Sequence, residues 1–156
     1  MIKYTEQQKN YFFVLVQALL FLIYAIPTSG NVFIISHLVE VLLYYIVVLG
    51  VVIILLTIVQ LNKNLSPFPS PMPNSPLLTN GLFKYVRHPI YTGIILIAFS
   101  FALLKVSIFK LIIAFLLTLL FYFKSKYEES LLAEKFENYS IYMKNTGRFF
   151  PKIIFK

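Results

Sequence analysis

Residues 32–61 read VFIISHLVEVLLYYIVVLGVVIILLTIVQL, a run with one histidine and one glutamate and no lysine, arginine or aspartate. A helix of this length extends about 45 Å at ~1.5 Å per residue, which is longer than the hydrocarbon core of a bilayer, about 30 Å. The run therefore predicts a membrane-spanning helix that tilts or projects beyond the bilayer.

The composition of the whole chain leads to the same conclusion. Of its 156 residues, 59% are hydrophobic and 13% are charged, whereas a soluble domain has about 25% charged residues. Such a chain has too little polar surface to cover a water-soluble globule, which excludes an ordinary soluble enzyme. The absence of cysteine excludes disulfides and a cysteine nucleophile, and with two histidines and no aspartate we expect no metal site.

Four apolar segments are expected to form helices: residues 11–26, 32–61, 90–104 and 109–123. The first two would be transmembrane helices within residues 1–61. The last two have 15 residues each, fewer than the ~20 that cross a bilayer, so we expect a short helical hairpin over residues 90–123. Residues 124–156 mix lysines with glutamates and are predicted to form a cytoplasmic amphipathic helix and a tail. The prediction is an all-α integral membrane protein, a single membrane domain with about four transmembrane helices.

Basic residues set the expected orientation. Of the 14 lysines and arginines, only Lys105 and Lys110 lie at the turn of the hairpin, and the other 12 lie at the opposite side of the four helices. The positive-inside rule makes the side with 12 charges cytoplasmic, so we expect both termini on the cytoplasmic side of the cell membrane. A nucleic-acid partner is not expected, because the basic residues sit between apolar runs and form no stripe with exposed aromatics.

Residues 62–89 are predicted to form a cytoplasmic loop that includes a dense polar motif. Five of the eight prolines fall between residues 67 and 76, which excludes a regular helix there. This composition is typical of a disordered polyproline linker. A well-patterned motif follows directly, however, so we favour an ordered segment that covers a site.

The densest polar motif is residues 78–93, LTNGLFKYVRHPIYTG. Proline is preorganised for the first position of a helix, so the third helix should begin at about Pro89. The free amide groups and positive dipole end of that helix would then face Arg87 and His88 and form an anion site. The alternative is that Arg87 and His88 only anchor a helix end among lipid headgroups.

A second polar cluster, residues 124–136, reads KSKYEESLLAEKF. The adjacent carboxylates Glu128 and Glu129 would point about 100° apart on a helix, so one can face inward while its neighbour faces water. The alternative is a solvated helix with a salt bridge between Glu128 and Lys124.

Together these segments form an ordered pattern over about residues 65–151: a proline-rich loop, L-T-x-G-x-F, R-H-P-x-Y-x-G, a hairpin, E-E-x-x-L-x-x-x-F, Y-x-x-Y and R-x-x-P. The pattern resembles the isoprenylcysteine carboxyl methyltransferase family and its prokaryotic relatives, which are also similar to phospholipid methyltransferases. The resemblance implies an integral-membrane methyltransferase that uses S-adenosylmethionine. It also implies carboxyl O-methylation of a lipidic or prenylated acceptor. This acceptor would enter the site from among the membrane lipids of the bilayer.

The resemblance implies roles for particular residues as well. Arg87 and Lys124 would bind the acceptor, with Lys124 standing where the family has an arginine, and Arg87 would orient the acceptor for attack. Glu129 would be the base if the acceptor were an amine. Phe83 stands where family members often have tyrosine. S-adenosylmethionine would be bound by nine residues: Pro76, Leu77, Leu78, Phe83, His88, Pro89, Ile90, Tyr91 and Glu128.

Two other classes of protein stay open at this point. Membrane sterol and steroid reductases, which bind a nicotinamide cofactor such as NADPH, have a similar pattern of glycine, aromatic and His/Asn-x-Tyr-x-Gly. The intact R-H-P followed by E-E-x-x-L favours the methyltransferase. A noncatalytic membrane adaptor would also fit the apolar helices and the asymmetric charge, and it predicts no small-molecule pocket at residues 87–91.

Overall fold

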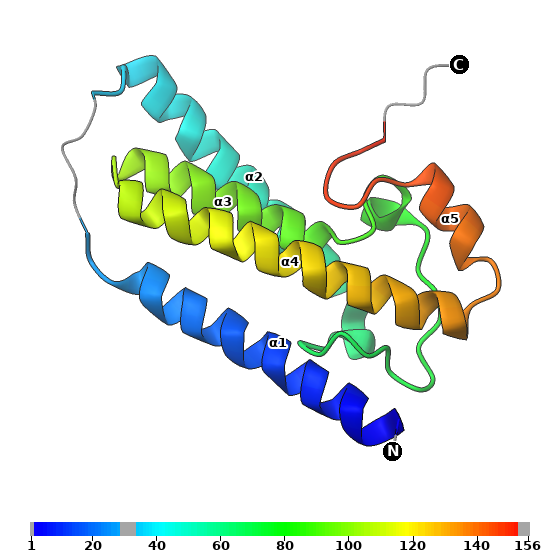
Figure 1. Ribbon diagram of the computed structural model, residues 1–156. Helices are drawn as coiled ribbons and strands as arrows, with labels where there is room; N and C mark the ends of the chain where they lie inside the picture. Colours follow the sequence, from blue (N-terminus) through cyan, green and yellow to red (C-terminus); the bar gives the residue numbers. More distant parts are fainter. Residues whose placement is uncertain (1, 29–33, 153–156) are drawn as a thin grey trace.

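The computed structural model describes residues 2–28 and 34–152, and in this part of the chain the regular elements are all helices. The predicted all-α class is therefore confirmed. Figure 1 shows long helices that lie along one another and a short helix beside one end of the bundle. The α-helices are α1 (Ile2–Ala25), α2 (His37–Leu61), α3 (Pro89–Leu104), α4 (Ile108–Lys135) and α5 (Tyr139–Asn145), and the short 3₁₀ helices are η1 (Asn62–Asn64) and η2 (Gly81–Lys84).

Three of the described helices, α1, α2 and α4, are long and apolar enough to cross a membrane. α3 has 16 residues, fewer than the ~20 that span a bilayer independently. It packs between α2 and α4, which supply the apolar contacts that a short helix needs. The predicted number of about four spans therefore depends on α3 and stays a prediction.

α4 differs from the expected arrangement. The sequence predicted one helix over residues 109–123 and a separate cytoplasmic helix after residue 124, whereas the structure has one continuous helix from Ile108 to Lys135. Residues 121–135 contain no proline or glycine and several leucines, glutamates and lysines, which are good helix formers. The change from apolar to charged composition is compatible with a helix that continues out of the bilayer, so it was no signal of a helix end.

α1 and α2 also begin at residues other than those predicted. α1 starts at Ile2 rather than at residue 11, because the polar residues before residue 11 include no helix breaker. α2 starts at His37, where the side chain of Ser36 accepts a hydrogen bond from the Val39 amide (3.4 Å) and caps the helix. The predicted start of this helix, residue 32, lies outside the described residues.

The long helices pack in the order α1, α4, α3, α2, each on the next. α2 and α3 cross closely at two glycines. A Cβ atom on Gly50 would lie 2.8 Å from the carbonyl oxygen of Gly93, and one on Gly93 would lie 2.7 Å from the carbonyl oxygen of Gly50. Small residues of this kind let membrane helices approach backbone to backbone.

The polar elements gather at one end of the bundle. The start of α1, the end of α2, the start of α3 and the end of α4 lie there, together with η2 and α5 (Figure 1). This arrangement agrees with the expectation that the proline-rich loop and both terminal regions share one side. Which side of the membrane this is stays a prediction from the charge distribution.

At the opposite end, α1 is tied to the turn between α3 and α4. Lys110 is buried, and its Nζ donates to the carbonyl oxygens of Tyr24 (2.6 Å) and Ile26 (3.0 Å) at the C-terminal end of α1. A cation at a helix C-terminus is favourable because the last carbonyl groups carry partial negative charge. α1 is thus held both along α4 and at this end.

Gly93→Ala should lower the melting temperature of the protein in detergent. The added Cβ atom has no space beside the Gly50 carbonyl oxygen, and overpacking of this kind costs about 1–3 kcal/mol. Thermal unfolding followed by circular dichroism measures the change. Val51→Ala, on an exposed face of α2, is the control, and a Gly93→Ala variant as stable as this control would contradict the close crossing.

Candidate active site

The R-H-P motif places a helix start at the polar end of the bundle. α3 begins at Pro89, as predicted, and the buried residue His88 is its N-cap. Backbone amides in the first turn of a helix have no acceptor within the helix. The N–H groups of Ile90 and Tyr91 can therefore be donated to a ligand.

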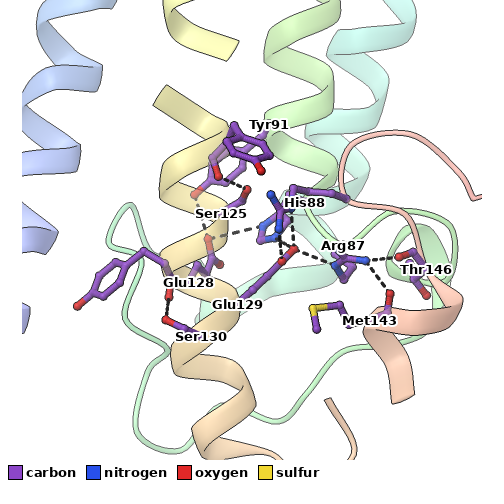
Figure 2. A network of polar contacts seen from close by, with 12 residues as sticks. Arg87, His88, Tyr91, Ser125, Glu128, Glu129, Ser130, Met143 and Thr146 are labelled. Atoms are coloured by element: carbon purple, nitrogen blue, oxygen red, sulfur yellow. Dashed lines mark hydrogen bonds and ion pairs between the residues drawn. The ribbon is translucent and has the colours of Figure 1, made fainter. Parts of the chain in front are cut away.

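The segment after α5 holds this motif in place. Val86 and Gly147 form a parallel bridge, the Arg87 amide donates to the carbonyl oxygen of Gly147 (2.8 Å), and the His88 amide donates to that of Arg148 (3.1 Å). The guanidinium of Arg87 also donates to the carbonyl oxygen of Met143, within α5, and to that of Thr146, directly after α5 (Figure 2). The motif is thus fixed by backbone contacts that the sequence pattern does not reveal.

The carboxylate of Glu129 lies at the centre of a buried ion network (Figure 2). Its Oε1 atom accepts from Arg87 Nε (2.8 Å) and from His88 Nε2 (3.1 Å), and its Oε2 atom accepts from Arg148 Nη2 (2.6 Å). The side chain of Glu129 is 5% exposed and that of Arg87 is 8% exposed. A buried carboxylate is stable only when paired in this way, so Glu129 joins α4 to the start of α3 and to the C-terminal segment.

Glu128 lies on the other side of His88. The Tyr91 hydroxyl donates to Glu128 Oε2 (3.1 Å), and His88 Nδ1 lies 3.6 Å from the same oxygen. Because a carboxylate can only accept, the contact with Glu129 requires that Nε2 of His88 carries a proton. The Tyr91 ring stacks on both His88 and Phe121, with centroid distances of 5.4 and 4.7 Å, and this stacking fixes the ring beside Glu128.

A cavity of about 390 Å³ opens beside these residues. Its volume falls within the range of small-molecule and cofactor sites, about 300–1,000 Å³. Its walls come from α1, α2, α3, α4, α5 and the proline-rich loop. Every residue predicted to bind the cofactor lines it, and so do Arg87 and Lys124, whereas Glu129 does not.

The proline-rich loop covers the cavity. Two lysines of α4 form hydrogen bonds with its backbone. Lys124 Nζ donates to the carbonyl oxygen of Pro67 (2.9 Å), and Lys135 Nζ donates to those of Met72 (2.5 Å) and Ser75 (3.2 Å). Proline lacks an amide hydrogen, so a segment with this composition is held through its carbonyl oxygens.

Lys124 is buried at the wall of the cavity, with 1% of the residue exposed. Its Nζ donates to Gln17 Oε1 (2.6 Å) as well as to Pro67, and it lies 5.5 Å from the centre of the Tyr91 ring. Both hydrogen-bond acceptors are neutral. Among the residues that the structure describes, no carboxylate lies within 4.0 Å of this ammonium group.

A protein-family model, described as phospholipid methyltransferase, matches residues 37–139, from the start of α2 to the first residue of α5. The match covers more than half of the chain and includes the R-H-P motif and both adjacent glutamates. The chain belongs to the phospholipid methyltransferase family. The resemblance to membrane methyltransferases is thereby confirmed, and with the three apolar helices the match makes this an integral membrane protein. No curated protein and no solved structure matches the chain.

Sequence reasoning missed several contributors to the site of this family member. Gln17 lines the cavity from α1, outside the matched residues, and Arg148 reaches Glu129 from beyond their end. A signal existed for each. Gln17 is an amide within an apolar membrane helix, where polar residues are functional candidates by default, and Arg148 is the arginine of the R-x-x-P pattern.

The two tyrosines of the Y-x-x-Y pattern also belong to the site. Tyr139 is buried at the cavity wall, and burial raises its pKa. Burial likewise raises the pKa of Tyr142 to about 12, so its hydroxyl keeps its proton and donates to the carbonyl oxygen of Phe83 (2.5 Å). α5 therefore fixes the short helix η2, which carries Phe83 to the cavity.

Glu129→Gln should destabilise the protein by about 3–5 kcal/mol, the cost of removing one partner of a buried ion network. The amide keeps one acceptor oxygen but leaves two guanidinium groups without a counter-ion. Thermal unfolding in detergent measures the loss, and Glu134→Gln, an exposed position on the same helix, is the control. A Glu129→Gln variant that unfolds at the control's temperature would show that the network contributes nothing to stability.

Proposed function

We propose that this chain is an S-adenosylmethionine-dependent methyltransferase that methylates the carboxylate of a lipidic or prenylated acceptor. One observation carries the proposal. Eight of the nine residues predicted to bind the cofactor lie within residues 76–91 and the ninth is Glu128, and all nine line one cavity with the two residues predicted to bind the acceptor. A noncatalytic adaptor would have no reason to bring these side chains to a common cavity.

The residues present fit the chemistry of S-adenosylmethionine. The methionine carboxylate suits the free amides of Ile90 and Tyr91, because the start of a helix attracts an anion. It suits His88 in the imidazolium form, in which Nδ1 also carries a proton, since Nε2 already donates to Glu129. The carboxylate of Glu128 can accept hydrogen bonds from ribose hydroxyls or from the amino group of the cofactor. The adenosine end suits the apolar part of the wall, formed by Pro76, Leu77, Leu78 and Phe83.

Bound S-adenosylmethionine would supply a methyl group on a sulfonium, and its transfer to a carboxylate oxygen forms a C–O bond as the C–S bond breaks, with no proton to remove. The residues of the chain then need to align the acceptor and exclude water. Alignment of this kind is worth several kcal/mol of an activation barrier. The proline-rich loop, held by Lys124 and Lys135, forms one wall of the cavity, and a site that excludes water would favour the reaction of two opposite charges.

The acceptor side of the cavity supports an anionic substrate. Lys124 is a buried cation whose hydrogen-bond acceptors, Gln17 and Pro67, are neutral. A buried cation gains most from an anionic partner, and the carboxylate of an acceptor would be that partner. The hydrogen bonds that the structure gives to Arg87 use Nε and Nη1, which leaves Nη2 to orient the acceptor.

The family description favours a second candidate, the N-methylation of a phospholipid amine. An amine must lose a proton before or during transfer, so a base is required. The sequence assigned this role to Glu129, but its oxygens accept hydrogen bonds from three side chains and it does not line the cavity. Glu128 lines the cavity and is the better-placed base, while Glu129 holds Arg87 and His88.

An acceptor assay separates the two candidates. Purified protein in lipid nanodiscs is supplied with S-adenosylmethionine labelled in its methyl group and with either N-acetyl-S-farnesylcysteine or phosphatidylethanolamine. The proposal predicts label on farnesylcysteine that alkali releases as methanol, because a methyl ester is hydrolysed by base and an N-methyl group is not. Alkali-stable label on phosphatidylethanolamine alone would favour the second candidate and contradict the first.

Glu128→Gln should weaken binding of S-adenosylhomocysteine by about 1.5–3 kcal/mol, the contribution of a charge-assisted hydrogen bond. Isothermal titration calorimetry measures this against the wild type, with Glu134→Gln as the control that binds normally. The wild type should bind S-adenosylhomocysteine and not NADPH. Binding of NADPH alone would indicate a reductase, binding of neither would indicate an adaptor, and unchanged affinity in Glu128→Gln would remove Glu128 from the cofactor site.

A further inference from the structure

Residues 146–149, here called the C-terminal strap, run beside the R-H-P motif and lie beyond the end of the family match at residue 139. The amides of Arg87 and His88 donate to carbonyl oxygens of the strap, and the Thr92 hydroxyl in the first turn of α3 donates to the carbonyl oxygen of Phe149 (2.7 Å). The strap therefore contacts the start of α3 at several successive residues. No residue of the strap lines the cavity.

Arg148 extends from the strap to the buried carboxylate. Its Nη2 donates to Glu129 Oε2 (2.6 Å) and its Nε to Glu129 Oε1 (3.2 Å), a two-pronged contact that fixes the plane of the carboxylate. The guanidinium also lies 4.9 Å from the centre of the Tyr122 ring. Burial by itself lowers the pKa of Arg148, but the hydrogen bond and the charge of Glu129 outweigh it and raise the pKa, so the residue stays charged.

The orientation of the Glu129 carboxylate sets that of the His88 ring. With Oε2 held by Arg148, Oε1 faces His88 and accepts from Nε2 (3.1 Å). The other ring nitrogen, Nδ1, then lies on the side of Glu128, which lines the cavity. The Phe149 ring lies edge-on to the His88 ring, with 6.2 Å between the ring centres.

We infer that Arg148 is a positioning residue for the cofactor site, and that it acts through Glu129 to hold the His88 ring where the carboxylate end of the cofactor binds. The inference rests on the proposed function. Because Arg148 does not line the cavity, it has no direct contact with a ligand bound there and acts through Glu129 and His88. Its positive charge also offsets the negative charge of Glu129 beside a residue that receives an anion.

Two ligands distinguish positioning from a merely structural role. S-adenosylhomocysteine carries the amino-acid end with its carboxylate, whereas 5′-methylthioadenosine has the same adenosine and sulfur but no amino acid. If Arg148 positions His88, its loss weakens the first ligand and spares the second. If Arg148 only supports the fold, its loss weakens both ligands alike.

The experiment is isothermal titration calorimetry of the full chain in detergent with each ligand. Arg148→Gln should bind S-adenosylhomocysteine about tenfold more weakly or worse, as for a lost charge-assisted hydrogen bond, and should bind 5′-methylthioadenosine as the wild type does. The affinity of Arg148→Lys for S-adenosylhomocysteine should lie between those of the wild type and Arg148→Gln, because lysine keeps the charge but not the planar fork. Lys152 is an exposed lysine four positions after Arg148, beyond the strap, and Lys152→Gln should bind both ligands with wild-type affinity.

Each outcome supports or overturns the inference. Equal affinity of wild type and Arg148→Gln for S-adenosylhomocysteine would overturn it and leave the proposed function standing, and equal losses for both ligands would overturn it as well. If Arg148→Gln does not fold, Arg148→Lys takes its place: a loss confined to S-adenosylhomocysteine supports the inference, and any other result overturns it. A wild type that fails to bind S-adenosylhomocysteine would instead contradict the proposed function.

Discussion

The site depends on one buried negative charge, the carboxylate of Glu129. In surroundings of low dielectric, burial of an unpaired ion costs several kcal/mol of folding free energy, so this carboxylate needs charged hydrogen-bond donors from neighbouring segments. It accepts hydrogen bonds from Arg87 and His88, in the turn before α3, and from Arg148, in the C-terminal strap. The start of α3, whose free amides suit an anion, is therefore placed relative to α4 by charge as much as by apolar packing.

A second set of contacts fixes the proline-rich loop as a wall of the cavity at the polar end of the bundle. Two lysines of α4, Lys124 and Lys135, hold the carbonyl oxygens of a loop that can form no helix of its own. Lys124 also bonds Gln17 of α1, so one ammonium group connects the first helix, the cover and the cavity wall. The hydrogen-bond acceptors of this buried ammonium group are neutral, which links the architecture of the loop to the anionic acceptor that we propose.

Much of the fold and of the cavity wall could be predicted because the signals are local. Apolar runs mark the membrane helices, Pro89 marks the start of α3, and the residues proposed to bind the cofactor belong to short motifs. The unbroken α4 was mispredicted because a change in composition was taken for a helix end. The contacts of Gln17 and Arg148 could not be predicted, since they join separate segments; Gln17 and Lys124 are 107 positions apart. Glu129 was expected at the reaction centre, and only the packing reveals that its oxygens are already engaged by the chain.

The central claim is that the cavity between the proline-rich loop and α3 is the cofactor site. A structure of the full chain with S-adenosylhomocysteine bound, determined by crystallography or electron cryomicroscopy, tests it most directly. The account predicts the ligand in this cavity, with its carboxylate at His88 and the first turn of α3 and its adenosine against Leu77, Leu78 and Phe83. A ligand bound elsewhere on the protein, or seated in the cavity with its carboxylate away from His88, would contradict the account.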